Sequence, residues 1–370
     1  MHLIILLLLD FLSGCQTECK IPNPKSQIPN LNPYLRPMAK EIVLSGIRPT
    51  GFLHLGNYFG AVKNWAKMQD EYDCYFCVVD WHSLTTHPDT KELRQNVHRM
   101  ISELLAAGLD PDRSVIYVQS DIPEIAELYL YFNTLAYKGE LEKTSTFKEK
   151  VRQQPDNANA GLLTYPVLQA ADILVHRAVK VPVGKDQEQH LEMSRNFAQR
   201  FNYRYGDVFP LPYAFNYGSE LTKILSLDGN GKMSKSQNQM ATIYLVDDDD
   251  MIRKKIMKSK TDSGPTEKGM PKADYIQNLF LLMQLVSDYT VVAKYETDYE
   301  DCSIRYGDMK KQLAEDMVAF IGPLREKAAA IQSDKAYLSK VIRQGREKGR
   351  ASAAKTIKLV REAMQFDFDN

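Results

Sequence analysis

From residue 40 onward, apolar and polar positions follow two spacings that take turns along the chain. Short, nearly continuous apolar runs are typical of buried strands, and apolar positions three and four apart are typical of helices packed on one side. The predicted strands are residues 41–47, 74–80, 114–119 and 179–183. The predicted helices between and after them are residues 54–69, 90–107 and 186–201. Such alternation predicts an α/β fold, a parallel sheet with helices on both faces.

Two stretches depart from this alternation. Residues 124–176 read as mostly helical and predict an insertion between two strands of the sheet. After residue 236 only the short run at 241–246 resembles a strand, and helical patterns follow it to the end of the chain. We therefore expect an α/β domain over residues 38–246 and an all-helical domain over residues 247–370.

The first 37 residues are set apart from this pattern. Residues 3–9 are apolar, and Leu12-Ser-Gly-Cys15 looks like the cleavage site of a lipoprotein signal. No Lys or Arg precedes the run, Asp10 interrupts it, and it is too short to span a bilayer. A stretch rich in Pro and Asn follows, which is typical of disorder. We favour an extension upstream of a start at Met38 over a targeting signal and leave these residues out of the fold.

Composition limits the kind of partner that the whole chain attracts. The 370 residues are 44% hydrophobic and 25% charged, as in ordinary globular proteins, and the formal net charge is zero. Any nucleic-acid surface must therefore be a local basic patch. Cys74 and Cys77 form a CxxC pair in a predicted strand, where residues three apart point to opposite faces. We interpret them as two core cysteines, with no metal or redox role.

The first candidate site is His54-Leu-Gly-Asn57, which follows a strand and a turn and opens a helix. Ligands of open parallel sheets bind beyond the carboxyl ends of the strands, where helix N-termini offer amide protons to phosphates. Gly56 would let a nucleotide approach the backbone closely. The tetrad alone is equally compatible with a surface histidine beside a glycine at a helix start.

The second candidate site is Gly231-Lys-Met-Ser-Lys-Ser236, a glycine-flanked loop with two ammonium groups and two hydroxyls. Such a loop can bring positive charge to a polyphosphate, but basic loops are common and solvated ones need no ligand. The two segments together resemble the signatures of class I aminoacyl-tRNA synthetases, a HIGH-type tetrad after the first strand and a KMSKS loop after the last. The resemblance implies a Rossmann-like catalytic domain with a helical insertion, followed by a helical anticodon-binding domain.

A third segment concerns the amino acid. Tyr165, Gln169 and Asp172 are spaced to share one helix face among apolar neighbours, where a carboxylate needs a hydrogen-bond donor. The helix resembles the YPxLQAAD helix that tryptophanyl and tyrosyl enzymes share. Four further stretches resemble the bacterial tryptophanyl-tRNA synthetase family: residues 46–51, 80–87, 181–187 and 345–366. Asp172 could accept from an indole N–H or from a tyrosine hydroxyl, so it does not discriminate between the two substrates.

The family resemblance implies roles for individual residues. His54, Asn57, Lys232 and Lys235 would be the catalytic residues. The expected ATP-binding residues are Arg48, Pro49, Thr50, Gly56, Asn57, Gly184, Lys185, Asp186, Ile224, Lys232, Met233, Ser234, Lys235 and Ser236. The expected tryptophan-binding residues are Gly46, His82, Tyr165, Gln169, Asp172 and Gln187. Arg48, Gln169 and Lys185 differ from the residues of some relatives, which leaves the role of the Lys185 side chain open.

The expected reaction joins tryptophan to tRNA(Trp) with ATP, assisted by Mg²⁺ at the phosphates. The attacking tryptophan carboxylate is already ionised, so positioning and charge stabilisation carry the chemistry. The resemblance also implies a homodimer formed through the insertion, a cytoplasmic location and no membrane partner. Some relatives bind an iron–sulfur cluster through four cysteines of the helical domain, but this chain has only Cys302 there and we expect none. The alternatives are a tyrosyl-tRNA synthetase, an inactive RNA-binding paralogue and an exported lipoprotein.

Two basic clusters are candidates for contact with RNA. The first lies at residues 253–260 and follows the acidic residues 247–250, an order that also simply complements a helix dipole. The second is the set Arg343, Arg346, Lys348 and Arg350, in the domain that reads the anticodon in the family.

Overall fold

The computed structural model describes residues 40–184, 187–217, 223–234, 238–366 and 368. Contacts divide the chain into residues 1–39 and a second unit, residues 40–370, which holds all of the described residues. The interpretation of residues 1–37 as an upstream extension lies outside the described residues. None of the helices described is both long enough and apolar enough to cross a membrane.

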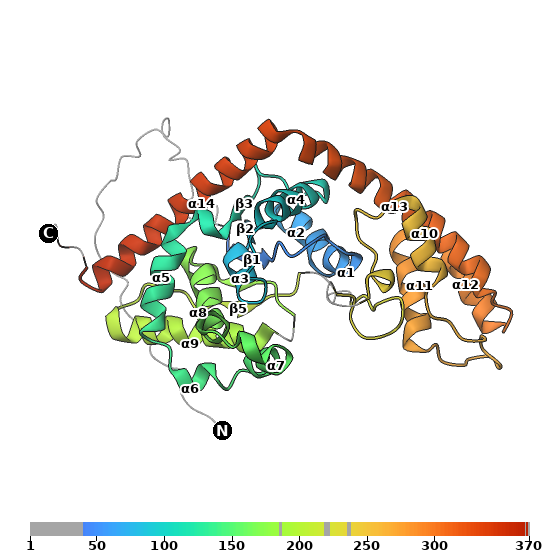
Figure 1. The fold of residues 1–370 in the computed structure, drawn as a ribbon, viewed down its shortest axis with the longest axis horizontal. Helices are drawn as coiled ribbons and strands as arrows, with labels where there is room; N and C mark the ends of the chain where they lie inside the picture. The colour runs from blue at the N-terminus through green and yellow to red at the C-terminus, as the bar shows by residue number, and fades with distance from the viewer. Residues whose placement is uncertain (1–39, 185–186, 218–222, 235–237, 367, 369–370) are drawn as a thin grey trace, which may run out of the picture. The chain divides into compact units, whose positions relative to one another are not determined.

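Five parallel strands form the sheet, in the order β3-β2-β1-β4-β5 (Figure 1). Their bounds are β1 Ile42–Ile47, β2 Asp73–Val78, β3 Val115–Val118, β4 Lys180–Val181 and β5 Tyr213–Ala214. Ile47 pairs with Val78, and Val78 with Val118, so the carboxyl ends of β1, β2 and β3 meet at one edge. The chain builds outward from β1 to β3 and then returns to the other side of β1. This reversal places the topological switch point, where such folds bind ligands, beside β1.

Each face of the sheet carries its own apolar core. Cys74, Phe76 and Val78 pack on one face, and Tyr75 and Cys77 pack on the other, because successive strand side chains point to opposite sides. The expectation that the two cysteines cannot converge is confirmed, and both are free and buried. The helical segment of the first face runs through α1 Leu55–Asn57, a π-helical turn Tyr58–Val62 and α2 Lys63–Met68, and α4 Leu93–Ala106 packs beside it.

The second face is covered largely by the predicted insertion. Its helices are α5 Pro123–Asn133, α6 Lys138–Leu141, α7 Ser145–Gln153 and α8 Ala160–Val175, and α9 Glu188–Tyr205 follows β4. Contacts join α8 to both α5 and α9. The predicted helical insertion is thus confirmed, and the buried side chains of α8 join the apolar core on this face of the sheet.

One predicted strand is wrong. Residues 241–246 form no strand of the sheet: a short 3₁₀ turn spans Gln239–Ala241, and Tyr244 makes a single antiparallel bridge with His54. The last strand is instead β5, which pairs with β4. The apolar residues near 241–246 are buried against the first helical segment, and this burial produces the apolar pattern without a strand.

The chain after residue 247 is helical, as predicted. Its helices are α10 Asp249–Met257, α11 Asp274–Val286, α12 Tyr289–Glu300, α13 Tyr306–Ser333 and α14 Lys335–Ala363. These helices pack on the α/β part: α13 contacts α4, and α14 crosses β3 and α5 (Figure 1). At the crossing a Cβ atom on Gly345 would overlap the carbonyl oxygen of Ile116, so only glycine fits there. The boundary at residue 247 stays a prediction.

Candidate active site

The turn after β1 forms the first edge of the candidate site. Pro49 is buried, Thr50 is half-buried, and the Thr50 N–H donates to the carbonyl of Arg48 at 2.8 Å. A Cβ on Gly46 would lie 3.0 Å from the Val79 side chain, so the glycine lets β1 and the end of β2 approach closely. Arg48 is exposed, and its pKa is lowered by desolvation and partly raised again by the nearby Tyr165. The Arg48 guanidinium donates to the Thr86 hydroxyl at 3.5 Å.

His54 and Asn57 cap the start of α1, because the side chain of each accepts a hydrogen bond from the backbone N–H of the other. His54 Nδ1 accepts from the Asn57 N–H at 3.3 Å, and Asn57 Oδ1 accepts from the His54 N–H at 3.4 Å. A ring nitrogen that accepts carries no proton, so the neutral His54 ring holds its proton on Nε2. His54 is 4% exposed, and that Nε2–H is a donor suited to a phosphate oxygen.

The signature loop is built on a backbone hairpin. The Met233 N–H donates to the Ile224 carbonyl at 2.9 Å, and Leu225 bridges to Lys232. Ile224 and Met233 are buried in the core, whereas Lys232 is exposed and Ser234 is half-buried. With its side chain fully buried, Ile224 can offer a nucleotide only its backbone. Lys235 and Ser236 lie outside the described residues.

Asn278 of α11 supports this hairpin through two hydrogen bonds to its backbone. It is 4% exposed, its Oδ1 accepts from the Leu225 N–H at 2.9 Å, and its Nδ2 donates to the Leu225 carbonyl at 3.1 Å. A side-chain amide thus pairs with a backbone strand as a neighbouring strand would. Nothing in the sequence near Asn278 signals this role, because the pairing joins residues 53 positions apart.

The two signature segments meet in the structure. A Cβ on Gly56 would lie 3.0 Å from His54 Nδ1 and 3.5 Å from the Met233 Cβ, so the glycine leaves room for the ring and the loop together. The Leu55 N–H also donates to the Ile243 carbonyl at 3.0 Å, just after the loop. Among the described residues, the two segments therefore lie side by side although they are far apart in the sequence.

The carboxylate of Asp172 lies at the centre of the second half of the site. Asp172 is 3% exposed and accepts from Gln119 Nε2 at 2.8 and 3.0 Å. His82 Nε2 of α3, Asp80–Leu84, lies 2.9 Å from Oδ2 of the same carboxylate. The predicted need for a donor is therefore met twice. His82 was expected here from the resemblance, but Gln119 was not.

Burial and the negative charge of Asp172 keep the neighbouring groups neutral. Burial raises the pKa of the Cys77 thiol well above its usual value, and Asp172 raises it further. Burial raises the pKa of the Tyr117 hydroxyl well above its usual value, and interactions with Cys77 and Asp172 raise it further. A pocket floor of neutral groups around one carboxylate suits a neutral apolar ligand that carries a single donor.

Tyr165 and Gln187 meet at a buried histidine that sequence reasoning missed. The Tyr165 hydroxyl makes a short hydrogen bond with His190 Nε2, and Gln187 Oε1 lies 3.1 Å from His190 Nδ1. His190 lies fully buried in α9, and its ring packs edge-on against that of Tyr165. Gln169 is half-buried on α8, one turn from Asp172. The expected tryptophan-binding residues therefore surround the carboxyl ends of β1, β2 and β3.

The rest of the expected ATP set is only partly described. Gly184 is half-buried, and its carbonyl accepts from the Gln187 N–H at 2.9 Å. The roles expected of Lys185 and Asp186 fall outside the described residues. Among the residues described, no group of three or more His, Cys, Asp or Glu side chains is arranged to hold a metal ion.

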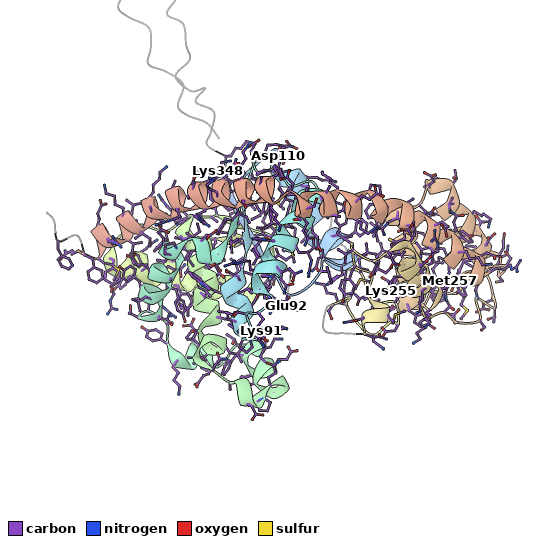
Figure 2. All side chains as sticks on the ribbon, turned by 45° about the horizontal axis from the view of Figure 1, so that its top comes forward. Lys91, Glu92, Asp110, Lys255, Met257 and Lys348 are labelled. Atoms are coloured by element: carbon purple, nitrogen blue, oxygen red, sulfur yellow. The ribbon has the colours of Figure 1, made fainter. Side chains whose placement is uncertain are left out.

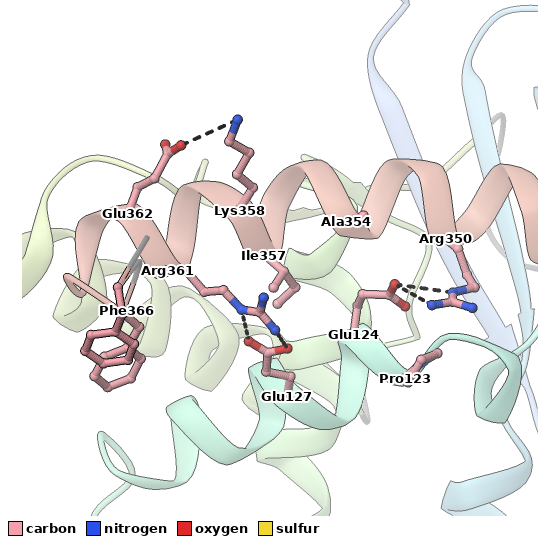
Figure 3. A pocket seen from close by; sticks show the side chains of 11 residues that line it. Pro123, Glu124, Glu127, Arg350, Ala354, Ile357, Lys358, Arg361, Glu362 and Phe366 are labelled. Carbon is pink, nitrogen blue, oxygen red and sulfur yellow. Dashed lines mark hydrogen bonds and ion pairs between the residues drawn. The ribbon is translucent and has the colours of Figure 1, made fainter. Parts of the chain in front are cut away.

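Two clefts among the described residues lie elsewhere. One of about 800 Å³ opens at the amino ends of the strands, near Ile42, Asp73 and Val115. Another, of about 590 Å³, lies between α5 and α14 (Figure 3). Sheets of this kind bind ligands at the opposite, carboxyl edge, so chemistry rather than cleft size locates the candidate site.

Three residues of the basic cluster at 343–350 make contacts within the molecule, although Arg343, Arg346 and Arg350 are exposed, and the interpretation of the cluster as an RNA surface stays a prediction. Arg346 pairs with Asp121 at 3.0 Å, and Arg350 pairs with Glu124 at 3.3 Å (Figure 3). Lys348 donates to the Pro111 carbonyl at 2.8 Å, close to Asp110 (Figure 2). These side chains fasten α14 to the α/β part.

The cluster at residues 253–260 follows the helix-dipole interpretation. Asp248 caps α10 by accepting from the Met251 N–H at 2.7 Å, and Lys254 and Lys255 lie in its last turn. Lys255 is buried and pairs with Asp247 at 2.6 Å, and Arg253 pairs with Glu315. Lys254 and Lys258 are exposed. The described positions of this cluster are therefore explained largely by the helix and its neighbours.

A Rossmann-like sheet whose first helix start meets a KMSKS hairpin defines the class I aminoacyl-tRNA synthetases. The family described as "tRNA synthetases class I (W and Y)" matches residues 38–322, and the chain belongs to it.

Individual relatives are named for one amino acid, tryptophan, whereas the family description covers two. The chain is 54% identical to a tryptophan–tRNA ligase of Porphyromonas gingivalis over 88% of this chain and 99% of the relative. It is 38% identical to a tryptophan–tRNA ligase of Clostridium acetobutylicum over 88% of this chain and 97% of the relative. The crystal structure of tryptophanyl-tRNA synthetase from Campylobacter jejuni complexed with ADP and tryptophan has a TM-score of 0.78 and 34% identity, and the match covers 88% and 99% of the two chains.

Proposed function

We propose that this protein is a tryptophan–tRNA ligase, an enzyme that activates tryptophan with ATP and transfers it to tRNA. The observation that carries the proposal is the likeness to tryptophan–tRNA ligases across almost their whole length, at up to 54% identity. The geometry supports it, because two segments suited to phosphates meet at the same sheet edge as a buried carboxylate.

The first step forms tryptophanyl-adenylate. An oxygen of the tryptophan carboxylate attacks the α-phosphorus of ATP, and the bond from that phosphorus to the β-phosphate oxygen breaks to release pyrophosphate. No base is required, because the nucleophile is already ionised. In the second step a hydroxyl of the tRNA end attacks the activated carbonyl and AMP leaves. Positioning and stabilisation of phosphate charge are therefore the main tasks of the protein.

In this proposal the phosphate side is formed by the two signature segments. His54 Nε2 donates to a phosphate oxygen from the helix start, and Asn57 holds the ring that carries it. The exposed ammonium of Lys232, together with Lys235, offsets the negative charge that builds on pyrophosphate. The backbone around Gly56 and Met233 leaves the space that a nucleotide needs.

The amino-acid side selects indole by its single donor. The N–H of the indole donates to the Asp172 carboxylate, and Tyr165, Gln169 and His82 surround the ring. A site built around such a hydrogen bond rejects an analogue without the donor by ~10⁴-fold or more. Phenylalanine is therefore excluded by binding alone.

Mg²⁺ enters this proposal with the substrate. The ion is carried on the phosphates of ATP, which are its usual ligands in enzymes that use ATP. There it supplies positive charge to the polyphosphate.

The assembly and location are proposals of the same kind. We propose a homodimer through the insertion, because Leu130 of α5 and Tyr137 beside it are 63% and 66% exposed. Cytoplasm is the compartment proposed, because ATP and tRNA are both available there.

An ATP–pyrophosphate exchange assay with tryptophan and with tyrosine tests the function. Tryptophan-dependent exchange that far exceeds the tyrosine-dependent rate is the expected result. Exchange with tyrosine alone would make the protein a tyrosyl enzyme. Exchange with neither would point to the inactive paralogue and end the proposal.

A further inference from the structure

Gln119 occupies a central position in the buried half of the site. It follows β3 directly, at the start of a 3₁₀ turn Gln119–Asp121, and is fully buried. Its side chain bonds to two other elements, α3 and α8, which carry His82 and Asp172. We propose that Gln119 is a positioning residue that selects the amino acid by holding the Asp172 carboxylate in its indole-accepting orientation. The inference rests on the proposed function and deepens it.

The orientation of the Gln119 amide is determined by its own contacts. Its Oε1 accepts from the backbone N–H of Trp81 at 3.1 Å and of His82 at 3.4 Å. Only an oxygen can accept these two bonds, so the NH₂ group must face Asp172. Gln119 therefore cannot rotate to present an acceptor to the carboxylate without losing both backbone bonds.

The contacts of Asp172 leave one oxygen less occupied. Gln119 Nε2 donates to both carboxylate oxygens, at 2.8 and 3.0 Å, and His82 Nε2 adds a bond to Oδ2 at 2.9 Å. Each ionised carboxylate oxygen accepts about two hydrogen bonds, so Oδ1 keeps capacity for one more donor. The indole N–H is the donor that this free position suits.

Gln119 also supports the negative charge of Asp172 without cancelling it. The other ionisable groups that face this carboxylate are His82, Cys77 and Tyr117, and the pKa values of the thiol and the phenol are raised by burial and by Asp172. Neither Cys77 nor Tyr117 brings positive charge. A neutral amide donor stabilises the carboxylate yet leaves it a strong acceptor.

The decisive experiment replaces Gln119 with an isostere that titrates. In Gln119→Glu, one carboxyl oxygen can still accept from Trp81 and His82. The other oxygen donates to Asp172 only while the pair shares a proton, and two ionised carboxylates at this distance repel. The KM for tryptophan should therefore rise about tenfold or more between pH 6 and pH 9, since each unit of pKa corresponds to a tenfold change. The KM for ATP should not rise in the same way between pH 6 and pH 9.

A matched control is Gln69→Glu. Gln69 is also a buried glutamine, 3% exposed, and its Nε2 donates to the carbonyls of Ala66 and Gly108 at 2.9 Å. It lies away from Asp172, so its replacement should lower stability without giving the tryptophan KM a dependence on pH. A tryptophan KM in Gln119→Glu with the pH profile of the wild type would overturn the inference.

A second variant serves if Gln119→Glu does not fold. Gln119→Met removes both the donor and the acceptor, and the KM for tryptophan should rise about tenfold. In the background of Asp172→Asn the same change should have almost no further effect, because the carboxylate it orients is gone. Additive effects of the two substitutions would refute the inference. If the wild-type protein shows no tryptophan-dependent exchange, the proposed function itself is refuted.

Discussion

The two halves of the proposed site, one for the amino acid and one for the phosphates, are built by different means. On the amino-acid side, buried side chains bond to one another: Gln119, His82 and Asp172 form a network with little exposure to solvent. On the phosphate side, the hairpin of Ile224 and Met233 is held by backbone bonds, and Lys232 extends from it into solvent.

The difference follows from what each half must recognise. One donor on an apolar ring can be selected only by an acceptor that is fixed in place and shielded from water. A polyphosphate carries several negative charges, and exposed ammonium groups attract it without being held in one exact geometry. The buried half should therefore respond to small changes of geometry, and the exposed half to loss of charge.

Loss of charge on the phosphate side should have the largest effect. Lys232→Ala should slow adenylate formation by ~10²–10³-fold, as removal of one group that stabilises transition-state charge typically does. The dissociation constant of tryptophan, measured by fluorescence or calorimetry, should change little. A large loss of tryptophan affinity would show that the two halves are not separate. Lys254→Ala, at an exposed lysine of α10, is the control.

Removal of the buried acceptor charge should come next. Asp172→Asn keeps the shape of the side chain but replaces an ionised acceptor, and a hydrogen bond to a charged group contributes about 1.5–3 kcal/mol. We expect kcat/KM for tryptophan to fall by ~10–10²-fold with little change in the KM for ATP, as measured by pyrophosphate exchange. An equal loss of kcat/KM for tryptophan and for ATP would contradict the division of the site into two halves.

A buried histidine outside the site, His176, should make stability depend on pH. His176 follows α8, is 1% exposed, and bonds to Tyr117 at 3.1 Å and to Ser352 of α14 at 3.2 Å. Burial lowers the pKa of His176 to about 3, whereas an unfolded histidine titrates near 6.5. The unfolded state binds the extra proton between these values, so stability falls as the pH drops below about 6.5.

At pH 5 this linkage costs ~2 kcal/mol of unfolding free energy relative to pH 8. Urea titrations at both pH values measure it, and His176→Gln should lose less stability on acidification than the wild type. The same acid sensitivity in both proteins would assign the effect to other groups.

The smallest effect should come from the support under the hairpin. Asn278→Ala leaves the N–H and the carbonyl of Leu225 without their side-chain partner. We expect the KM for ATP to rise by about tenfold, from a loss of ~1–1.5 kcal/mol, while the KM for tryptophan stays constant. Gln277→Ala, on the exposed face of the same helix, should change neither.

Most of the fold followed from patterns that are local in sequence. The strand–helix alternation, the helical insertion and the helical end of the chain were predicted correctly, because each depends on a period of two or 3.6 within a short window. The run at 241–246 misled because burial against a helix and burial in a sheet give the same apolar pattern. The two-residue strand β5 was too short to leave a pattern.

The sequence by itself determined the family, the two signature segments and the helix face that carries Asp172, because each is a motif or a spacing within a few residues. Only the tertiary structure decided which groups support them. Gln119 and Asp172 are 53 residues apart, and Arg346 and Arg350 of α14 pair with Asp121 and Glu124 of the α/β part, more than 200 positions earlier in the chain. Hydrogen bonds and ion pairs of this kind depend on how elements pack, and packing has no period that a sequence displays.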